Sequence, residues 1–426
     1  MNPENMKMAV VGLGYVGLPL AVEFSKHYPV VGFDISESRI SELKKGHDFT
    51  NEVSDEAMKS ALDSRLTLTS DEAMLADSNI FIITVPTPVD RNNNPDFSPL
   101  ISASQLVGRH IKKGDYVIYE STVYPGATEE VCVPIVEASS GMIFNTDFYV
   151  GFSPERINPG DKVNTLTTIK KVTSGSTEEA AKVINGIYQS IISAGTHMAE
   201  SIRVAEASKV IENTQRDVNI AFVNEIAKIC DLLDINTQQV LKAASTKWNF
   251  LNFSPGLVGG HCIGVDPYYI VHKAQQYGYS PNVLLQSRLV NESMGQFIAD
   301  KVIKLMCENR VEVVDSKVLI LGFAFKENCP DLRNTKVNDI VNGLRGYHCK
   351  VDVVDPWVNA EEAYKEYDLK LDKTITGKDY SAIVIAVNHS EFQVLDAVAL
   401  RKHMNSRGII YDVKGGCNAN EVEGQL

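Results

Sequence analysis

The chain has 426 residues, which is too many for one ordinary hydrophobic core, so we expect two or three domains. With 44% hydrophobic and 22% charged residues, the composition is that of a folded soluble protein. The net charge of −13 argues against a nucleic-acid partner, because phosphate binding requires a basic face. A small anionic ligand remains compatible with this charge, since it needs only a few local cations and backbone amides.

Apolar runs and cysteines exclude two further classes of protein. No apolar run approaches the ~20 residues that a membrane-spanning helix needs, and the first residues lack the layout of a signal peptide. We therefore expect no membrane partner. The seven cysteines are scattered and include no C-x-x-C pair, so neither a disulfide framework nor a metal site is expected. Together these features predict a protein of the reducing cytoplasm.

The first half of the chain alternates apolar runs with helical patterns, which predicts a parallel α/β sheet. We expect its strands at 8–11, 30–33, 80–85, 116–120 and 149–152. After about residue 315 the same alternation returns, with strands expected at 318–321, 351–354, 383–387 and 409–411.

Between these regions, more than thirty residues from Glu200 onward contain neither glycine nor proline. They predict one long helix over 201–233, followed by a shorter helix over Thr237–Ala244. The predicted fold is therefore α/β: two Rossmann-like parallel-sheet domains joined by a central helical domain with one long helix. We place the three domains at residues 1–198, 199–300 and 301–426.

The two α/β regions form a degenerate internal repeat. Each runs from a strand through a glycine turn and a helix to a second strand that ends in aspartate, Asp34 in the first copy and Asp355 in the second. In the second copy Ala324 and Glu327 replace the last two glycines of the turn. Close approach to a pyrophosphate needs those glycines, so only the first copy is expected to bind a dinucleotide.

The motif Gly12-Leu13-Gly14-Tyr15-Val16-Gly17 follows the first strand and opens a helix. Gly12 permits the tight turn, Gly14 lets the backbone approach the pyrophosphate, and Gly17 allows close packing of helix on strand. Tyr15 and Val16 complete the cofactor loop at the positive end of the helix. Asp34 follows Gly12 by 22 residues, as a ribose-binding carboxylate does, and favours NAD because it would repel the 2′-phosphate of NADP.

Three more side chains are candidates for this site. Arg39 either offsets the effect of Asp34 by attracting a 2′-phosphate or holds the adenosine side of NAD. Thr87 and Thr122 follow two of the predicted strands at the carboxyl edge of the sheet, where ligands lie. They are either ordinary turn hydroxyls or contacts to cofactor or substrate.

On the long helix Lys209, Asn213 and Arg216 are spaced i, i+4 and i+7 and share a face. Such a row can be a solvated surface. However, this helix carries apolar residues nearly all round, so we expect it to be buried and the polar row to face a ligand or a subunit interface. The same reasoning predicts a homodimer or a higher assembly.

A glycine-rich segment, GLVGGHCIGVD, carries Cys262. A lone cysteine is commonly a small core residue, but glycines such as Gly259 on either side favour an exposed loop. His261 suggests a metal, yet no other nearby Cys or His completes a ligand set. Asp266 lies close enough in sequence to orient a water molecule or a lysine.

The chain as a whole resembles the nucleotide-sugar 6-dehydrogenases, the UDP-glucose and GDP-mannose dehydrogenase family. It is most similar to the bacterial branch acting on UDP-N-acetylhexosamines. The motifs that carry the resemblance are VGLGYVGLPLA, VPTP, STVYPGATEE, SPERINPG, KVIENTQRDVNIAFVNE, PGLVGGHCIGVDPYY and GFAFKENCPDLRNTK.

The resemblance implies a four-electron oxidation of the sugar C6 alcohol to a carboxylate, with two NAD⁺ reduced, for surface polysaccharide synthesis. Cys262 is then the nucleophile, which forms a thiohemiacetal and a thioester. Lys209 is the acid/base or oxyanion-stabilising lysine, and Glu155 of the S-P-E motif is the acid/base glutamate. Asn213 and Asp266 position water, and the catalytic set also includes Thr122.

The resemblance also implies where the ligands lie. The first domain binds NAD, with Arg333 reaching it, the central domain forms the dimer, and the last domain binds UDP. The family's cross-subunit arginine falls near Lys247. UDP-glucose enzymes carry a second glutamate where this chain has Pro159, and SPERINPG fits N-acetylated sugars instead. The predicted substrate contacts are Glu155, Arg156, Ile157, Lys209, Asn213, Arg216, Lys247, Gly259 and Lys326.

Two other functions stay open from sequence. One is a two-electron NAD-dependent hydroxyacid dehydrogenase in which Lys209 is the base and Cys262 is inert. The other is a non-catalytic NAD-binding regulatory protein that has kept the fold. The residues also leave open whether the sugar is the gluco or the galacto epimer.

Overall fold

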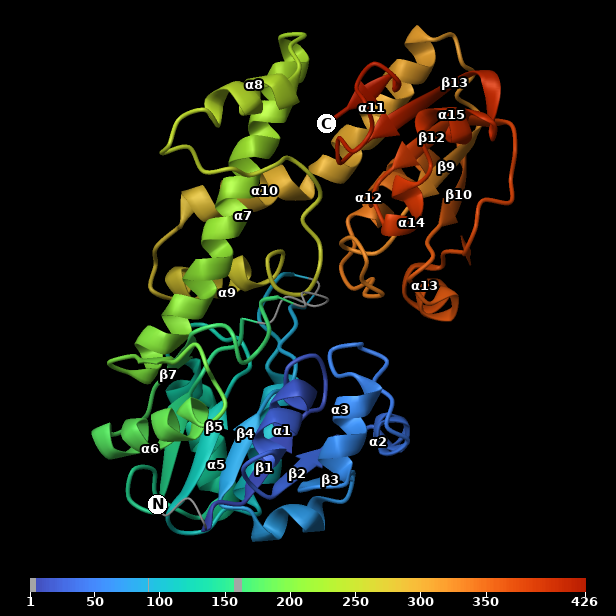
Figure 1. The fold of residues 1–426 in the computed structure, drawn as a ribbon. Coiled ribbons are helices and arrows are strands. Elements are labelled where there is room, and N and C mark those ends of the chain that lie inside the picture. Colours follow the sequence, from blue (N-terminus) through green and yellow to red (C-terminus); the bar gives the residue numbers. More distant parts are fainter. Residues whose placement is uncertain (1–4, 91, 157–162) are drawn as a thin grey trace. The chain divides into compact units, whose positions relative to one another are not determined.

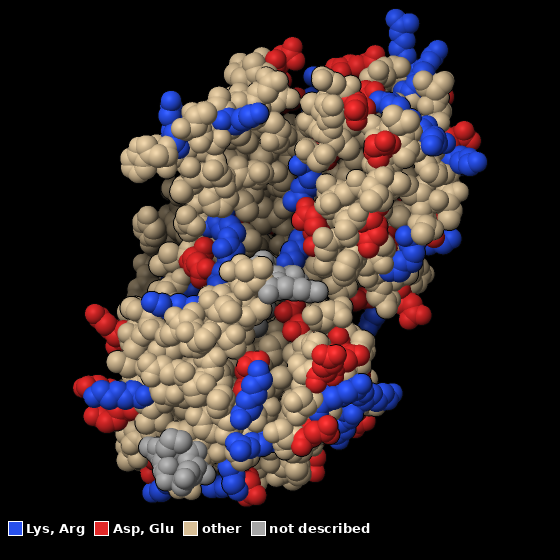
Figure 2. All heavy atoms as spheres, viewed as in Figure 1, with Lys and Arg blue, Asp and Glu red and all other residues tan. Residues whose placement is uncertain are grey.

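The computed structural model describes residues 5–90, 92–156 and 163–426. The chain divides into two compact units, which are drawn in Figure 1. The first contains the chain up to Glu212 together with Tyr268–Tyr279, and the second contains Asn213–Pro267 and Ser280–Leu426. On the face shown in Figure 2, acidic and basic side chains are interspersed over both units.

Among the described residues of the first unit, six strands form a parallel sheet in the order β3-β2-β1-β4-β5-β6. Strands β1 and β4 are buried at every position, as expected of continuous apolar runs in a parallel sheet. The strands are β1 (Met8–Val11), β2 (Val30–Phe33), β3 (Leu66–Thr69), β4 (Ile80–Ile83), β5 (Asp115–Tyr119) and β6 (Phe148–Phe152).

Helices cover both faces of this sheet. One core joins alternate strand residues, such as Ile82 and Ile118, to Phe24 and Ile184 on helices of one face. Tyr119 points to the other face, where its hydroxyl lies 2.9 Å from that of Ser104. The helices and the small second sheet are α1 (Gly17–Ser25), α2 (Glu37–Lys44), α3 (Asp55–Leu62), α4 (Ser98–Gly108), α5 (Val133–Ser140), α6 (Glu178–Gln189), β7 (Lys171–Thr173) and β8 (Thr196–Met198).

The second unit contains a sheet of the same topology, β11-β10-β9-β12-β13-β14, also parallel. Gly322 has φ +88° and donates its N–H to Val354 at 2.8 Å, just as Gly12, with φ +95°, donates to Phe33 at 2.8 Å. This structural repeat confirms the predicted pair of Rossmann-like sheets. The strands are β9 (Lys317–Leu321), β10 (Lys350–Val354), β11 (Leu371–Asp372), β12 (Tyr380–Ile385), β13 (Met404–Asp412) and β14 (Gly424–Gln425).

This second sheet also has a core on each face. Val318 and Ile320 face one core, while Leu319 and Leu321 between them face another. The helices of this part of the chain are α10 (Asn282–Glu292), α11 (Met294–Glu308), α12 (Val337–Gly346), α13 (Ala360–Tyr367), α14 (Ser390–Gln393) and α15 (Ala397–Arg401).

The predicted long helix is α7 (Ile202–Leu232), and it is followed by α8 (Thr237–Ala244) and α9 (Asp266–Gln276). The expectation that α7 is buried is only partly correct. Leu232, at the end of the helix, is exposed, and four more apolar side chains are exposed along its length: Val204, Ile211, Phe222 and Ile229. They are 7, 11 and 7 residues apart, close to whole helical turns, and therefore form one stripe along the helix. We call these four residues the α7 stripe.

No helix within the described ranges has the length and apolar character needed to cross a lipid bilayer.

The packing of α6 on the sheet yields a stability prediction. A Cβ at Gly151 of β6 would lie 2.3 Å from Cδ1 of Ile184, so Gly151→Ala is expected to lower the free energy of unfolding by roughly 1–3 kcal/mol. Gly186, within α6, has no neighbour within 4 Å of an added Cβ, so Gly186→Ala is the matched control. It is expected to add roughly 0.5–1 kcal/mol. Urea unfolding measures both changes, and equal effects would contradict this packing.

Candidate active site

The glycine turn of the first unit has the geometry that a dinucleotide requires. An added Cβ at Gly17 would lie 1.9 Å from the carbonyl oxygen of Gly12, so only glycine lets α1 begin this close to β1. Gly14 is exposed, and an added Cβ there would meet nothing within 4 Å. Tyr15 and Val16, both half-buried, lead from it into α1. The turn therefore offers open backbone and a helix N-terminus to a pyrophosphate.

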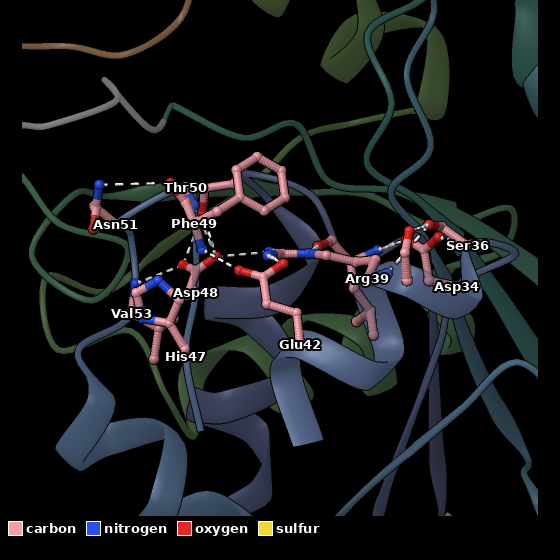
Figure 3. A network of polar contacts seen from close by, with 12 residues as sticks. Asp34, Ser36, Arg39, Glu42, His47, Asp48, Phe49, Thr50, Asn51 and Val53 are labelled. Atoms are coloured by element: carbon pink, nitrogen blue, oxygen red, sulfur yellow. Dashed lines mark hydrogen bonds and ion pairs between the residues drawn. The ribbon is translucent and has the colours of Figure 1, made fainter. Parts of the chain in front are cut away.

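Asp34 and Arg39 belong to one polar network beside this turn (Figure 3). The Asp34 carboxylate accepts the N–H groups of Leu13 and Ser36, each at 2.9 Å. Arg39 donates through Nε to the Leu13 carbonyl at 3.1 Å and through Nη2 to Asp48 at 2.7 Å.

Arg39 is almost completely buried, and its guanidinium carbon lies 4.4 Å from the centre of the Phe49 ring. Asp48, itself fully buried, balances its charge. A cation already paired in this way has little to offer a 2′-phosphate, so the network argues against the interpretation in which Arg39 offsets the effect of Asp34.

Thr87 and Thr122 lie together beyond the carboxyl ends of β4 and β5. The Thr87 hydroxyl donates to the Thr122 carbonyl at 2.6 Å, and the Thr87 carbonyl accepts the hydroxyl of Tyr269. Both threonines are half-buried. The predicted juxtaposition is therefore present at the edge where ligands of parallel sheets lie.

The structure also brings Glu155 and Lys209 together in the first unit. Both are buried, and the Lys209 ammonium donates to the carbonyl oxygen of Glu155. Arg156 forms an ion pair with Glu212 at 2.5 Å. Ile157 and Pro159 lie outside the described residues.

The sequence reasoning missed two charged residues near Glu155: Lys171, which contacts its carboxylate, and Glu120, which shares Lys171 with it. Lys171 donates to the Glu155 carboxylate at 2.7 Å and to Glu120 at 2.7 Å. Lys171 follows another lysine, which is typical of a solvated segment, and its burial depends on a three-residue strand without an apolar run.

In the second unit, Asn213 and Asp266 form a buried pair. The Asn213 amide donates to the Asp266 carboxylate at 2.5 Å, and the two side chains are 0% and 2% exposed. This hydrogen bond joins α7 to the first residue of α9. Sequence alone placed both residues in one site but did not predict this contact.

Cys262 lies in the turn that leads into α9 and is half-buried. Its carbonyl accepts the N–H groups of Val265 and Asp266 at 3.0 and 2.8 Å. Cys132, by contrast, is buried, and this burial raises the pKa of its thiol to about 12.

The glycines before Cys262 have a packing role that the sequence did not indicate. An added Cβ at Gly259 would lie 2.7 Å from the carbonyl oxygen of Asn334, and one at Gly260 would lie 2.9 Å from the Phe325 ring. These glycines therefore let the cysteine turn pack directly on the segment that carries Lys326.

The remaining predicted residues lie in the second unit. Lys326 is half-buried, with its Nζ 5.8 Å from the centre of the Phe325 ring. Arg333 pairs with Asp331 at 2.6 Å; burial alone would raise the pKa of Asp331, but Arg333 holds it below its ordinary value. Arg216 is half-buried on α7, and Lys247 is exposed beyond α8.

Asp355, the counterpart of Asp34 in the second sheet, is fully buried, whereas Asp34 is partly exposed. It accepts the N–H of Phe323 at 2.6 Å and Nε2 of His389 at 3.0 Å. Burial alone would raise the pKa of Asp355, but His389 and the backbone N–H groups hold it at about 2. A carboxylate enclosed in this way is not available to a ribose.

Within the described parts of the chain, no group of three or more His, Cys, Asp or Glu side chains is placed to hold a metal ion.

Comparison with known proteins finds matches along nearly the whole chain. Residues 6–192 match the NAD binding domain of the UDP-glucose/GDP-mannose dehydrogenase family, residues 203–293 its central domain and residues 319–419 its UDP binding domain. A UDP-N-acetyl-D-glucosamine 6-dehydrogenase of Pseudomonas aeruginosa is 55% identical over 411 residues, which cover 96% of this chain and 97% of that protein.

Two further similarities extend over nearly the whole chain. Protein CapL of Staphylococcus aureus is 52% identical over 420 residues, which cover 98% of each protein. A solved UDP-D-ManNAc dehydrogenase of Pyrococcus horikoshii superposes with a TM-score of 0.89 at 31% identity, covering 97% of this chain and 96% of that one.

The Asp34 network predicts a strong preference for NAD. Asp34→Ala removes the charge that would repel a 2′-phosphate, so the ratio of kcat/KM with NAD to that with NADP is expected to fall on the order of tenfold. Asp48→Ala, measured in parallel, tests whether release of Arg39 has a further effect in the same direction. An unchanged ratio for Asp34→Ala would show that this carboxylate does not select the cofactor.

Proposed function

The chain belongs to the UDP-glucose/GDP-mannose dehydrogenase family, whose members bind NAD, and from this premise we propose that it oxidises the C6 alcohol of a UDP-N-acetylhexosamine to a carboxylate. The observation that carries the proposal is the buried Asn213–Asp266 hydrogen bond next to the Cys262 turn. A two-electron dehydrogenase needs neither a thiol nor a water-positioning pair. An alcohol-to-acid enzyme needs both.

The proposed chemistry has two oxidation steps. NAD⁺, when bound, accepts the hydride from C6. An aldehyde has no good hydride to give until a nucleophile makes its carbon tetrahedral, and Cys262 supplies that nucleophile. The resulting thiohemiacetal gives up the second hydride to a second NAD⁺ and becomes a thioester. Water held by Asn213 and Asp266 then hydrolyses it, while Lys209 stabilises the oxyanion.

The N-acetylated substrate is supported by two features. The chain has Pro159 where UDP-glucose enzymes carry a second glutamate. In addition, the 55% identical protein is named a UDP-N-acetyl-D-glucosamine 6-dehydrogenase. The name of Protein CapL supports a role in capsule or another surface polysaccharide, made from a cytoplasmic nucleotide sugar.

We assign the UDP moiety to the second Rossmann-like sheet. Its incomplete glycine turn and the enclosed Asp355 argue against a dinucleotide there. The match of residues 319–419 to the family's UDP binding domain supports this division, with Lys326 as a substrate-facing cation. The predicted boundaries, 1–198, 199–300 and 301–426, then separate the NAD, central and UDP domains.

We further propose a homodimer formed through α7. The α7 stripe exposes Phe222 to 55% and Ile211 to 56%, although both lie on a helix whose opposite face is buried. A second copy of this chain would cover the stripe by symmetry.

The thiol role predicts a specific loss of function. Cys262→Ser is expected to keep NAD and UDP-sugar binding but to lower acid formation on the order of a thousandfold or more. Cys417→Ser, at the other half-buried cysteine, is the control and is expected to leave the rate unchanged. The wild type is expected to yield two NADH per acid formed, measured by absorbance and chromatography. One NADH per product, or near-normal acid from Cys262→Ala, would contradict the mechanism.

The dimer proposal predicts that Phe222→Asp dissociates the protein, because a buried unpaired carboxylate is costly. Val398→Asp changes another exposed apolar residue, on α15, and serves as control. Sedimentation at micromolar concentration is expected to show a dimer or larger species for the wild type and Val398→Asp, and a smaller one for Phe222→Asp. A monomeric wild type would refute the proposal.

A further inference from the structure

A buried cluster of charged groups lies beside the predicted acid/base glutamate. Glu120 follows β5, Glu155 follows β6, Lys171 lies on β7 and Tyr188 on α6. The Lys171 ammonium lies 2.7 Å from one carboxylate oxygen of Glu120 and 2.7 Å from one of Glu155. The Tyr188 hydroxyl donates to the other oxygen of Glu120. None of the four side chains is more than 7% exposed.

The cluster holds two carboxylates and one ammonium, so its charge is −1 when all three groups are ionised. Burial raises the pKa of Glu120, and the neighbouring Glu155 raises it further, while Lys171 opposes both effects. Burial alone would lower the pKa of Lys171, but the two carboxylates raise it. One added proton makes the cluster neutral, and a low-dielectric interior favours that state.

Other charged groups also approach Glu155. From α7, the Lys209 ammonium contacts its peptide carbonyl rather than its carboxylate. The adjacent Arg156 donates its backbone N–H to the carboxylate at 2.5 Å, and its guanidinium pairs with Glu212. Lys171 is therefore a side-chain cation in direct contact with this carboxylate.

Structural stability alone gives little reason for such a cluster. Replacing a buried ion cluster by packed apolar residues is often neutral or stabilising, whereas a net charge left in the interior is a cost. A cluster that accepts and releases one proton during catalysis, in contrast, has to exist both with a charge of −1 and in a neutral state.

We propose that Glu120, Lys171 and Glu155 hold one exchangeable proton as a unit, with Lys171 and Glu120 as positioning residues that set the proton affinity of Glu155. This inference rests on the proposed function, and it takes for Glu155 the acid/base role that the family resemblance implies. The C6 hydroxyl loses its proton to a Glu155 oxygen, the C6–H electron pair leaves as hydride to NAD⁺, and the C6–O double bond forms. The cluster goes from −1 to neutral and later returns the proton to solvent.

Two substitutions test this with opposite expected signs. In Glu120→Gln one negative charge is lost and Lys171 pairs with Glu155 alone, so the acid limb of kcat/KM is expected to move down by about one pH unit or more. In Lys171→Met the cation is lost, so the acid limb is expected to move up by a similar amount. Lys171→Arg keeps the cation and is expected to leave the limb in place, even if the rate falls.

Asp115→Asn is the matched control. Asp115 is a buried carboxylate at the amino end of β5, whereas Glu120 follows the carboxyl end of the same strand. Burial raises the pKa of Asp115 to about 6, and its carboxylate accepts the N–H of Lys112 at 2.7 Å rather than contacting the cluster. Its removal is expected to leave the limb unchanged.

A second readout separates this inference from the proposed function. Titration of ¹³C-labelled glutamate side chains by NMR, without substrate, is expected to show that the cluster takes up its proton at a lower pH in Glu120→Gln than in the wild type. In Asp115→Asn this pH is expected to be unchanged. Unmoved carboxyl titration and unmoved acid limbs would overturn the proton-holding unit. Shifted titration in a wild type that forms no NADH with UDP-N-acetylhexosamines would instead count against the proposed function. If Lys171→Met does not fold, Glu120→Gln and Lys171→Arg still test whether the three residues hold one proton as a unit.

Discussion

A carboxylate buried at the carboxyl edge of a parallel sheet has to have its lone pairs satisfied, and much of this structure follows from that constraint. Asp34, Asp355 and Asp412 each lie at or just after the end of a strand and accept N–H groups from nearby loops. Asp412, for example, accepts three backbone N–H groups, from Lys414, Gly415 and Cys417, at 2.7–3.0 Å. The loops on which ligands of such sheets lie are therefore held by side chains of the sheet itself rather than by loop packing.

The same constraint makes the two halves of the repeat chemically different. Asp34 and Asp355 occupy equivalent positions, and both accept an N–H from the residue after the first glycine of the turn. Asp355 also accepts a hydrogen bond from His389, whose ring stacks on Trp357 at an interplanar angle of 15°. Asp34, by contrast, accepts the backbone N–H groups of Leu13 and Ser36 and remains partly exposed. The same arrangement of strand and glycine turn thus supports one carboxylate that can face a ligand and one that is wholly structural.

This contrast shows what sequence could predict. Continuous apolar runs located β1 and β2 to the residue and α7 to within one residue at each end, because a buried parallel strand or a long helix imposes its own pattern. Strands without such runs, including β3, β7 and β11, were missed. At the site, residue types were predictable but partners were not. Nothing in the local sequence Lys170-Lys171 indicates that the second lysine is buried between two glutamates. The assigned roles and domain boundaries remain predictions.

Helix α7 satisfies two opposing demands. Lys209 and Asn213, one turn apart, are buried and hydrogen-bonded, whereas the α7 stripe on another side is exposed and apolar. A helix is stiff, so polar groups fixed along it keep their spacing better than groups on loops. Cys262 lies instead on a turn, but Gly259 and Gly260 pack that turn against Asn334 and Phe325, and Asp266 continues it into α9. The single residue proposed for covalent chemistry is therefore on a short turn that is fixed at both ends, where a thiol can reach a substrate without a flexible loop.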